Sequence, residues 1–176
     1  MDIELIKSLL TYAITVVFFI MIFNRDYRRV GLVVFLSTLY PILAVDPLVN
    51  PTDQEAISRL GVAIKLDGIT AFTLVFVFAT GDDKQSSLAI KQGALLVFAT
   101  LLHTVVSLGL LTSADETYIV YMLYAEIIAF ICALQLWTAR DGIIQSLGSV
   151  RRYLHRVLTV RSGFGESNST QSKVKG

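Results

Sequence analysis

Residues 60–80 read LGVAIKLDGITAFTLVFVFAT, a run that is mostly apolar and contains no polar residue between positions 74 and 79. A helix needs about 20 residues to cross a hydrocarbon core about 30 Å thick, and this run has that length. A barrel strand would alternate apolar and polar residues, which LVFVFA at 74–79 does not. A helix also satisfies its backbone hydrogen bonds within one segment, as lipid requires. The run therefore predicts a transmembrane helix.

Four further apolar runs, at residues 3–23, 30–45, 93–111 and 118–139, have a similar character. Hydrophobic residues make up 54% of the 176 positions, and the mean hydropathy is +0.65. The charged fraction is 16%, whereas soluble domains have about 25%. We therefore predict an all-α, polytopic integral membrane bundle of five transmembrane helices over residues 1–139.

The C-terminal region has a different pattern. Over residues 140–161, apolar residues recur at helical spacing and the opposite face carries Arg151, Arg152 and Arg156. Such a basic amphipathic helix is typical of segments that lie in the headgroup layer, so these arginines are predicted to bind anionic lipid headgroups. Packing of this helix against protein is the alternative. Residues 162–176 are rich in Ser, Gly and Lys, which predicts a disordered cytoplasmic tail.

The basic residues predict the orientation. Loops that stay in the cytoplasm carry the excess of Lys and Arg. Twelve of the 15 cations follow the first, third and fifth apolar runs. The opposite side has Lys7 and Arg59 near its boundary and carries seven acids: Asp2, Glu4, Asp46, Asp53, Glu55, Asp115 and Glu116. This places the N-terminus outside and the C-terminus in the cytoplasm, in a bacterial-type inner membrane or a plasma membrane.

Three ionisable residues, Asp67, His103 and Glu126, lie inside three different apolar runs. A charged group at the bilayer centre costs roughly 2.5 to 3.5 kcal/mol on insertion scales, so each residue needs a partner or a wet cavity. Counted at about 1.5 Å per residue from the outer boundary, the three lie about 10 to 12 Å deep. They are predicted to form one polar seam in the outer half of the bilayer.

Neighbouring polar residues could contribute to this seam. Thr70 is on the face of Asp67, and Ser107 is one turn from His103. Lys65 is only two residues from Asp67 and points to another face, so we expect its ammonium to snorkel to the outer surface. It remains a possible contributor.

Two carboxylates and an imidazole could hydrogen-bond helices together, relay protons or ions, or bind a divalent metal. The sequence contains no HExxH motif and no pair of candidate ligands at i, i+3 or i+4 within one run, so the metal signal is weak. No catalytic residue or cofactor is assigned. A lone cysteine excludes a disulfide within the chain, and no nucleic-acid motif is present.

These observations favour a non-enzymatic integral membrane protein, an oligomeric channel-like or membrane-assembly component whose partners are the bilayer, anionic lipid headgroups and copies of itself or another membrane protein. One alternative is a small intramembrane enzyme that uses Asp67, His103 and Glu126 as metal ligands or as acid and base. A phage-type membrane lysis or exclusion factor is another. The sequence does not identify a substrate or an ion.

Overall fold

A computed structural model describes residues 3–44, 53–78, 83–112 and 117–170. The described chain is helical and contains no strand. Its elements are listed in chain order: α1 (Ile3–Met21), α2 (Arg28–Ala44), α3 (Asp53–Phe72), the π-helical η1 (Thr73–Phe78), α4 (Asp83–Thr112) and α5 (Thr117–Thr170). The all-α prediction is therefore confirmed.

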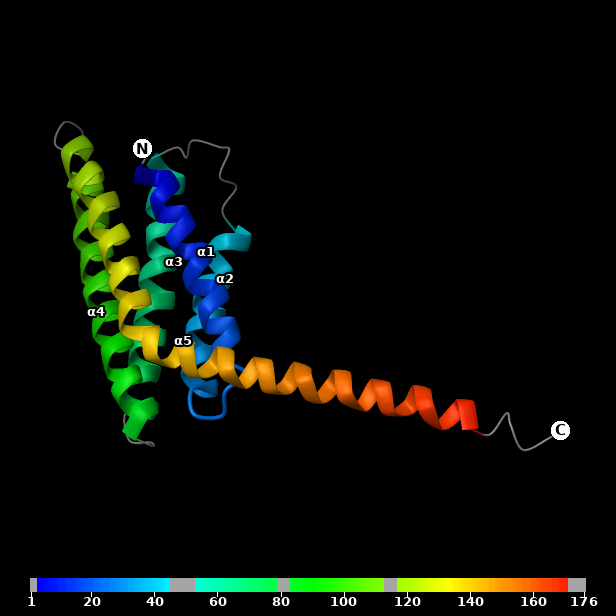
Figure 1. The fold of residues 1–176 in the computed structure, drawn as a ribbon. Helices are drawn as coiled ribbons and strands as arrows, with labels where there is room; N and C mark the ends of the chain where they lie inside the picture. The colour runs from blue at the N-terminus through cyan, green and yellow to red at the C-terminus, as the bar shows by residue number, and fades with distance from the viewer. Residues whose placement is uncertain (1–2, 45–52, 79–82, 113–116, 171–176) are drawn as a thin grey trace.

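The helices lie side by side in one bundle (Figure 1). The turn between α1 and α2 is at the lower end, where η1 also ends and α4 begins. We call this the basic end, because it carries the cations Arg25, Arg28, Arg29, Lys84 and Lys91. In the turn itself, the Asn24 side-chain oxygen accepts a hydrogen bond from the Asp26 backbone N–H at 3.1 Å. Asparagine favours such short turns, which lets α2 fold back against α1.

Helix α5 changes direction. Its first part follows the bundle down to the basic end, and its second part runs across that end and projects beyond it (Figure 1). At the change of direction, the Thr138 hydroxyl donates to the carbonyl groups of Leu134 and Gln135 at 2.9 and 3.0 Å. Side-chain bonds to helix carbonyls are a recognised cause of bending.

The transverse part of α5 packs across the α1–α2 turn. A Cβ built on Gly142 would lie 2.6 Å from Met21 Cε and 3.6 Å from Tyr27 Cδ1, so glycine allows this close approach. The Tyr27 hydroxyl donates to Gln145 Oε1 at 3.3 Å. Burial and the nearby carboxylates of Asp26 and Asp141 raise the pKa of Tyr27, which keeps the hydroxyl a proton donor.

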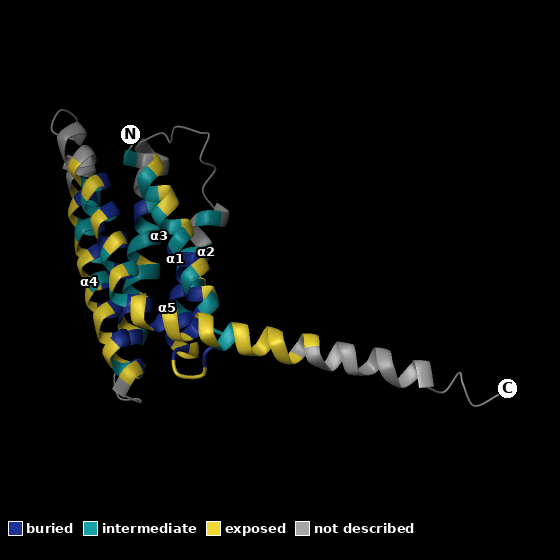
Figure 2. Cartoon of the chain, viewed as in Figure 1, coloured by how far each residue is buried: buried dark blue, intermediate teal, exposed yellow. Residues whose placement is uncertain are grey.

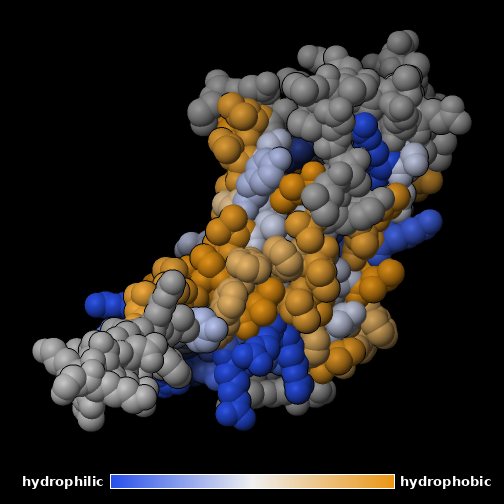
Figure 3. Space-filling view, turned by 90° about the vertical axis from the view of Figure 1, so that its right-hand side faces the viewer, coloured by the Kyte–Doolittle hydropathy of each residue, from blue (hydrophilic) through white to orange (hydrophobic). Residues whose placement is uncertain are grey.

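Buried positions lie on the inner faces of the helices, and exposed positions lie on their outer faces (Figure 2). Phe18, Val34 and Leu74 are fully buried in one cluster with Ile14, Met21, Tyr27, Val30, Ala71, Leu88, Ala89, Leu96, Cys132 and Ala139. Large apolar side chains such as Phe76, Leu101 and Phe130 are 60 to 67% exposed. Hydrophobic residues cover the middle of the face seen in Figure 3, with hydrophilic residues beneath them. An apolar exterior of this extent suits lipid contact.

Three helices are long and apolar enough to cross a membrane, judged over the described residues: Ser58–Phe78, Lys84–Leu108 and Leu123–Arg156. The apolar part of α1, Leu5–Met21, is shorter. Together these segments indicate a membrane protein.

Several helix boundaries differ from those expected. Helix α4 begins at Asp83, ten residues before the predicted apolar run at 93–111, because its first turns are polar and lie outside that run. The predicted run 118–139, the amphipathic segment 140–161 and part of the expected disordered tail form the single helix α5, which ends at Thr170. No proline interrupts residues 117–170, so backbone hydrogen bonding can propagate through the polar region. Residues 171–176 lie outside the described residues.

The π-helical turns of η1 were also not expected. The Thr73 hydroxyl, at the start of η1, donates to the Ile69 carbonyl at 2.8 Å. Within η1, Val75 lies directly against α4, where a Cβ on Gly93 would be 2.6 Å from Val75 Cγ2. Because Gly93 has no side chain, the π-helical segment η1 can lie in close contact with α4.

Candidate functional site: a polar pair between α3 and α4

Asp67 and His103 meet between α3 and α4. Asp67 Oδ2 lies 3.4 Å from His103 Nδ1, and their side chains are 21% and 8% exposed. The contact is close enough for ionic attraction, but its alignment does not meet hydrogen-bond geometry, and Nδ1 has no other hydrogen-bond partner in the structure. Because an unpaired polar group in an apolar environment is costly, the proximity of the two side chains favours their pairing.

The packing of α3 on α4 explains why these side chains meet. Thr70 and Ala71 lie on the same helix face as Asp67 and are both buried. The Ala71 carbonyl oxygen lies next to Gly93 of α4, where a built Cβ would be 3.5 Å from it. Gly68 also faces α4, because a Cβ there would make ordinary van der Waals contact with Thr100 Cγ2 at 3.9 Å. The hydroxyls of Thr100 and Thr104 bond to carbonyls of their own helix, at Leu96 and Thr100. They therefore do not compete for Asp67.

A third helix adjoins the pair through an aromatic ring. The His103 and Tyr124 rings meet edge to face with centroids 5.5 Å apart, which brings α5 to the same level. Ser107, the other expected contributor, is half-buried one turn beyond His103. Asp67, His103 and Tyr124 thus form a contact between three helices.

Glu126 does not join this contact. It is exposed on α5, on the same side as Leu123, Phe130 and Trp137. The buried side of α5 instead carries Ala125, Ala129, Cys132 and Ala139. Because small residues allow close helix approach, they turn Glu126 away from the bundle. The structure therefore brings together two members of the expected seam and directs the third outward.

Lys65 is likewise exposed, on the outer side of α3 with Ile69, Phe72 and Phe76. Among the described side chains, no group of three or more His, Cys, Asp and Glu residues is arranged to hold a metal ion. Asp67 and His103 alone offer two ligands. The expectation that Glu126 could complete a three-ligand set within one chain has no support in this arrangement.

A buried amide was missed by the sequence reasoning. Gln92 is fully buried, and its Nε2 donates to the Gln135 carbonyl at 2.9 Å and to Thr138 Oγ1 at 2.8 Å. Its Oε1 is buried without a hydrogen-bond partner in the structure. A glutamine is not ionisable and gave no charge signal, although its position at the edge of an apolar run could have drawn attention.

The arginines Arg151, Arg152 and Arg156 lie on the projecting part of α5, where residues 151–156 are all exposed. Leu147, Leu154 and Leu158 are 50 to 65% exposed there. This segment therefore does not pack against its own bundle. No protein-family model matches the sequence, and no curated protein or solved structure is significantly similar to it.

Proposed function

We propose that this chain is a non-enzymatic integral membrane protein that assembles with copies of itself through the outer faces of α3 and α5. The observation that carries the proposal is the exposure of Glu126 on an apolar helix face within a candidate span. A lipid-facing carboxylate costs several kcal/mol, and the cost falls when a partner helix covers it. A helix from a second subunit supplies such cover.

The chain also carries a cation suited to Glu126. Lys65 is exposed on α3, with its stem along an apolar stripe. Lys65 precedes Asp67 by two residues on α3, and Glu126 follows Tyr124 by two residues on α5. Two residues correspond to about 3 Å of rise along a helix. Since Asp67, His103 and Tyr124 share one level, Lys65 and Glu126 lie within about one helical turn of that level.

Lys65 and Glu126 occupy different helices, so Lys65 of one subunit can pair with Glu126 of the next in a head-to-tail contact, whereas a two-fold contact would pair them reciprocally. Such heterologous contacts close into rings when the rotation between subunits permits. The faces around the two charges are apolar, with Ile69 and Phe72 beside Lys65 and Leu123 and Phe130 beside Glu126. An oligomeric ring of this kind supports a channel-like or membrane-assembly role.

The proposed topology has five membrane-crossing helices, with the N-terminus outside and the C-terminus cytoplasmic. Its support is the gathering of cations at the basic end, where α5 also projects, together with the positive-inside rule. The apolar helices α1 and α2 are packed alongside α3 to α5 and would cross the bilayer with them. The Asp67–His103 pair then acts as an internal contact that aligns α3 with α4.

A charge-swap experiment tests the assembly. Glu126→Lys and Lys65→Glu are made singly and together in the full chain, and the oligomer mass is measured in mild detergent and in nanodiscs by light scattering. We expect each single variant to shift the population toward monomer, because like charges then meet, and the double variant to restore the wild-type mass.

The matched controls are Glu126→Gln, which retains a polar group without charge, and Arg140→Glu, an exposed charge reversal on another level of α5. Retention of the wild-type mass in both single swaps, or a monomeric wild type, would contradict the proposal. Ion flux through vesicles containing wild type and the double variant then distinguishes a conducting ring from a closed assembly.

A further inference from the structure

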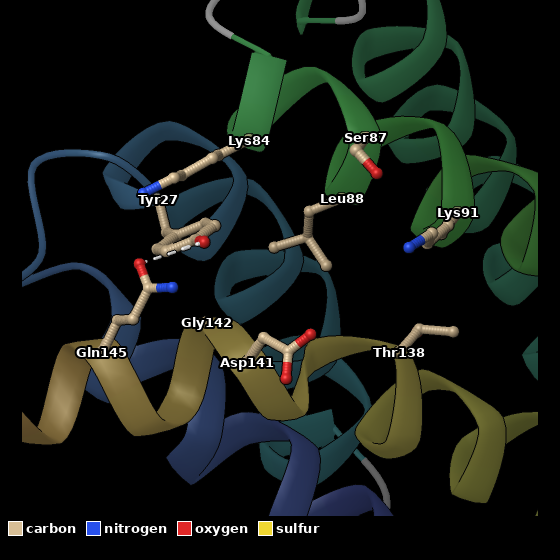
Figure 4. A pocket seen from close by; sticks show the side chains of 9 residues that line it. All are labelled: Tyr27, Lys84, Ser87, Leu88, Lys91, Thr138, Asp141, Gly142 and Gln145. Atoms are coloured by element: carbon tan, nitrogen blue, oxygen red, sulfur yellow. Dashed lines mark hydrogen bonds between the residues drawn. The ribbon is translucent and has the colours of Figure 1, made fainter.

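A hollow of about 340 Å³ lies at the basic end, where α4 begins and α5 changes direction (Figure 4). Its lining comes from three places in the chain: Tyr27 from the α1–α2 turn, Lys84, Ser87, Leu88 and Lys91 from α4, and Thr138, Asp141, Gly142 and Gln145 from α5. Its volume is within the range of about 300 to 1,000 Å³ that is typical of small-molecule sites.

The hollow combines cations with one carboxylate. Lys84 and Lys91 are exposed, and neither ammonium forms an ion pair with the described part of the chain. In Figure 4, Lys91 and Asp141 point toward the middle of the hollow from different helices, and Lys84 lies beside Tyr27 at one rim. Asp141 Oδ1 is 3.5 Å from Arg140 Nε, a contact exposed to solvent. Two ammonium groups and one carboxylate leave the lining with a net positive charge.

The hollow also lies at the end of two lipid-facing stripes. On α4, the exposed positions Ser87 and Lys91 continue into Phe98, Leu101 and Val105 at helical spacing. On α5, exposed Trp137 lies one turn before Asp141. A molecule with a charged head and apolar tails could therefore place its head in the hollow and its tails along these stripes.

We propose that this hollow binds the headgroup of a phospholipid that joins a phosphate diester to a primary ammonium, as phosphatidylethanolamine does. Lys84 and Lys91 bind the phosphate, with the Ser87 hydroxyl as a further donor, and Asp141 accepts hydrogen bonds from the ammonium. Basic pockets between helices at the cytoplasmic side of a membrane are known to take lipid heads. The carboxylate adds selectivity, because a choline head has no N–H to donate. The site lies at the basic end, away from the level of Lys65 and Glu126 at which the proposed oligomer would form.

Trp137, the single tryptophan of the chain, provides the measurement. It adjoins Thr138 and lies one turn from Asp141, so a lipid bound in the hollow brings its acyl chains near the indole. The full chain is reconstituted in phosphatidylcholine vesicles containing a small fraction of lipid brominated on the acyl chains, and quenching of Trp137 fluorescence is compared for ethanolamine, glycerol and choline heads.

We expect brominated phosphatidylethanolamine to quench more strongly than the choline and glycerol lipids at equal mole fraction. Lys84→Gln and Lys91→Gln should each lower its enrichment by roughly two- to fivefold. Asp141→Asn should remove the preference for ethanolamine over choline while the protein stays folded. Arg59→Gln, which removes one cation near the start of α3 at the opposite end of the bundle, should leave the enrichment unchanged, as should the triple change of Arg151, Arg152 and Arg156 to Gln.

Equal quenching by all three lipids would overturn the proposal, as would the strongest quenching by the glycerol head, which would indicate selection for negative charge alone. Loss of enrichment in the arginine triple variant, but not in Lys84→Gln or Lys91→Gln, would assign lipid binding to the projecting helix instead. Displacement of the ethanolamine lipid by soluble glycerophosphoethanolamine, but not by inorganic phosphate, would support recognition of the whole head. Thermal unfolding of each variant shows that the comparison is made on folded protein.

Discussion

Gln92 and Thr138 are joined by a hydrogen bond of 2.8 Å from the amide nitrogen to the hydroxyl oxygen, which links α4 to α5 where α5 changes direction. The same amide also reaches the Gln135 carbonyl. Thr138 and Gln135 keep partners within α5, since the Thr138 hydroxyl donates to the Leu134 and Gln135 carbonyls. The hydrogen bonds between α4 and α5 are therefore lost without Gln92, whereas Thr138 and Gln135 keep their hydrogen bonds within α5.

Substitution of Gln92 separates its hydrogen bonds from its volume. Gln92→Leu removes the bonds and the unpartnered Oε1 together, so we expect it to change the free energy of unfolding by about 1 kcal/mol or less. Gln92→Ala also leaves a cavity, so it should cost about 2 kcal/mol more. Reversible unfolding in mixed micelles measures both. Equal effects of the two variants would show that volume at this position is unimportant.

The Asp67–His103 contact should appear as a coupling energy. Asp67→Ala, His103→Ala and the double variant form a cycle, and we expect a favourable coupling of about 0.6 to 1.7 kcal/mol, the range found for polar contacts between membrane helices. As a matched control, a second cycle combines Asp67→Ala with Ser107→Ala, one turn from His103 on α4. We expect its coupling energy to be smaller. Additive effects of Asp67→Ala and His103→Ala would show that the two side chains act separately.

Gly31 is the glycine at which an added methyl group should be most harmful. A Cβ there would lie 3.0 Å from the Phe18 carbonyl oxygen and 3.1 Å from the Ile22 backbone nitrogen, and backbone atoms cannot move aside as a side chain can. We expect Gly31→Ala to destabilise the protein by about 1 to 3 kcal/mol. Gly148→Ala meets nothing within 4 Å and should be neutral or stabilising. Thermal unfolding of both variants tests the contrast, and a neutral Gly31→Ala would mean that α1 and α2 are farther apart.

The projecting part of α5 should rest on an anionic surface. A polarity-sensitive fluorophore is attached at Leu154→Cys in a Cys132→Ala background, and its emission is compared in vesicles with and without anionic lipid. We expect the emission to shift to shorter wavelength with anionic lipid, and high salt to reduce this shift. The shift should be lost when Arg151, Arg152 and Arg156 are all changed to Gln. The same emission in all vesicles would place this segment in water or against protein.

The sequence could predict where helices occur far better than where they end. Apolar runs of membrane-spanning length and the absence of alternation marked α3, α4 and α5 as apolar helices, because both signals follow from the chain alone. The start of α4 at Asp83 and the continuity of α5 to Thr170 were not foreseen, because polar residues extend a helix without an apolar signal. The close contact of Val75 in η1 with Gly93 in α4 involves two elements, so neither segment alone indicates it.

The candidate site was likewise only partly predictable from the sequence. The sequence by itself determined that Asp67, His103 and Glu126 lie within apolar segments, since this requires only their neighbours along the chain. Only the tertiary structure decided that Asp67 and His103 meet and that Glu126 faces outward, because the rotation of α5 depends on which of its faces packs best against the other helices. Small side chains at Ala125 and Ala129 permit the closest approach and so set that rotation.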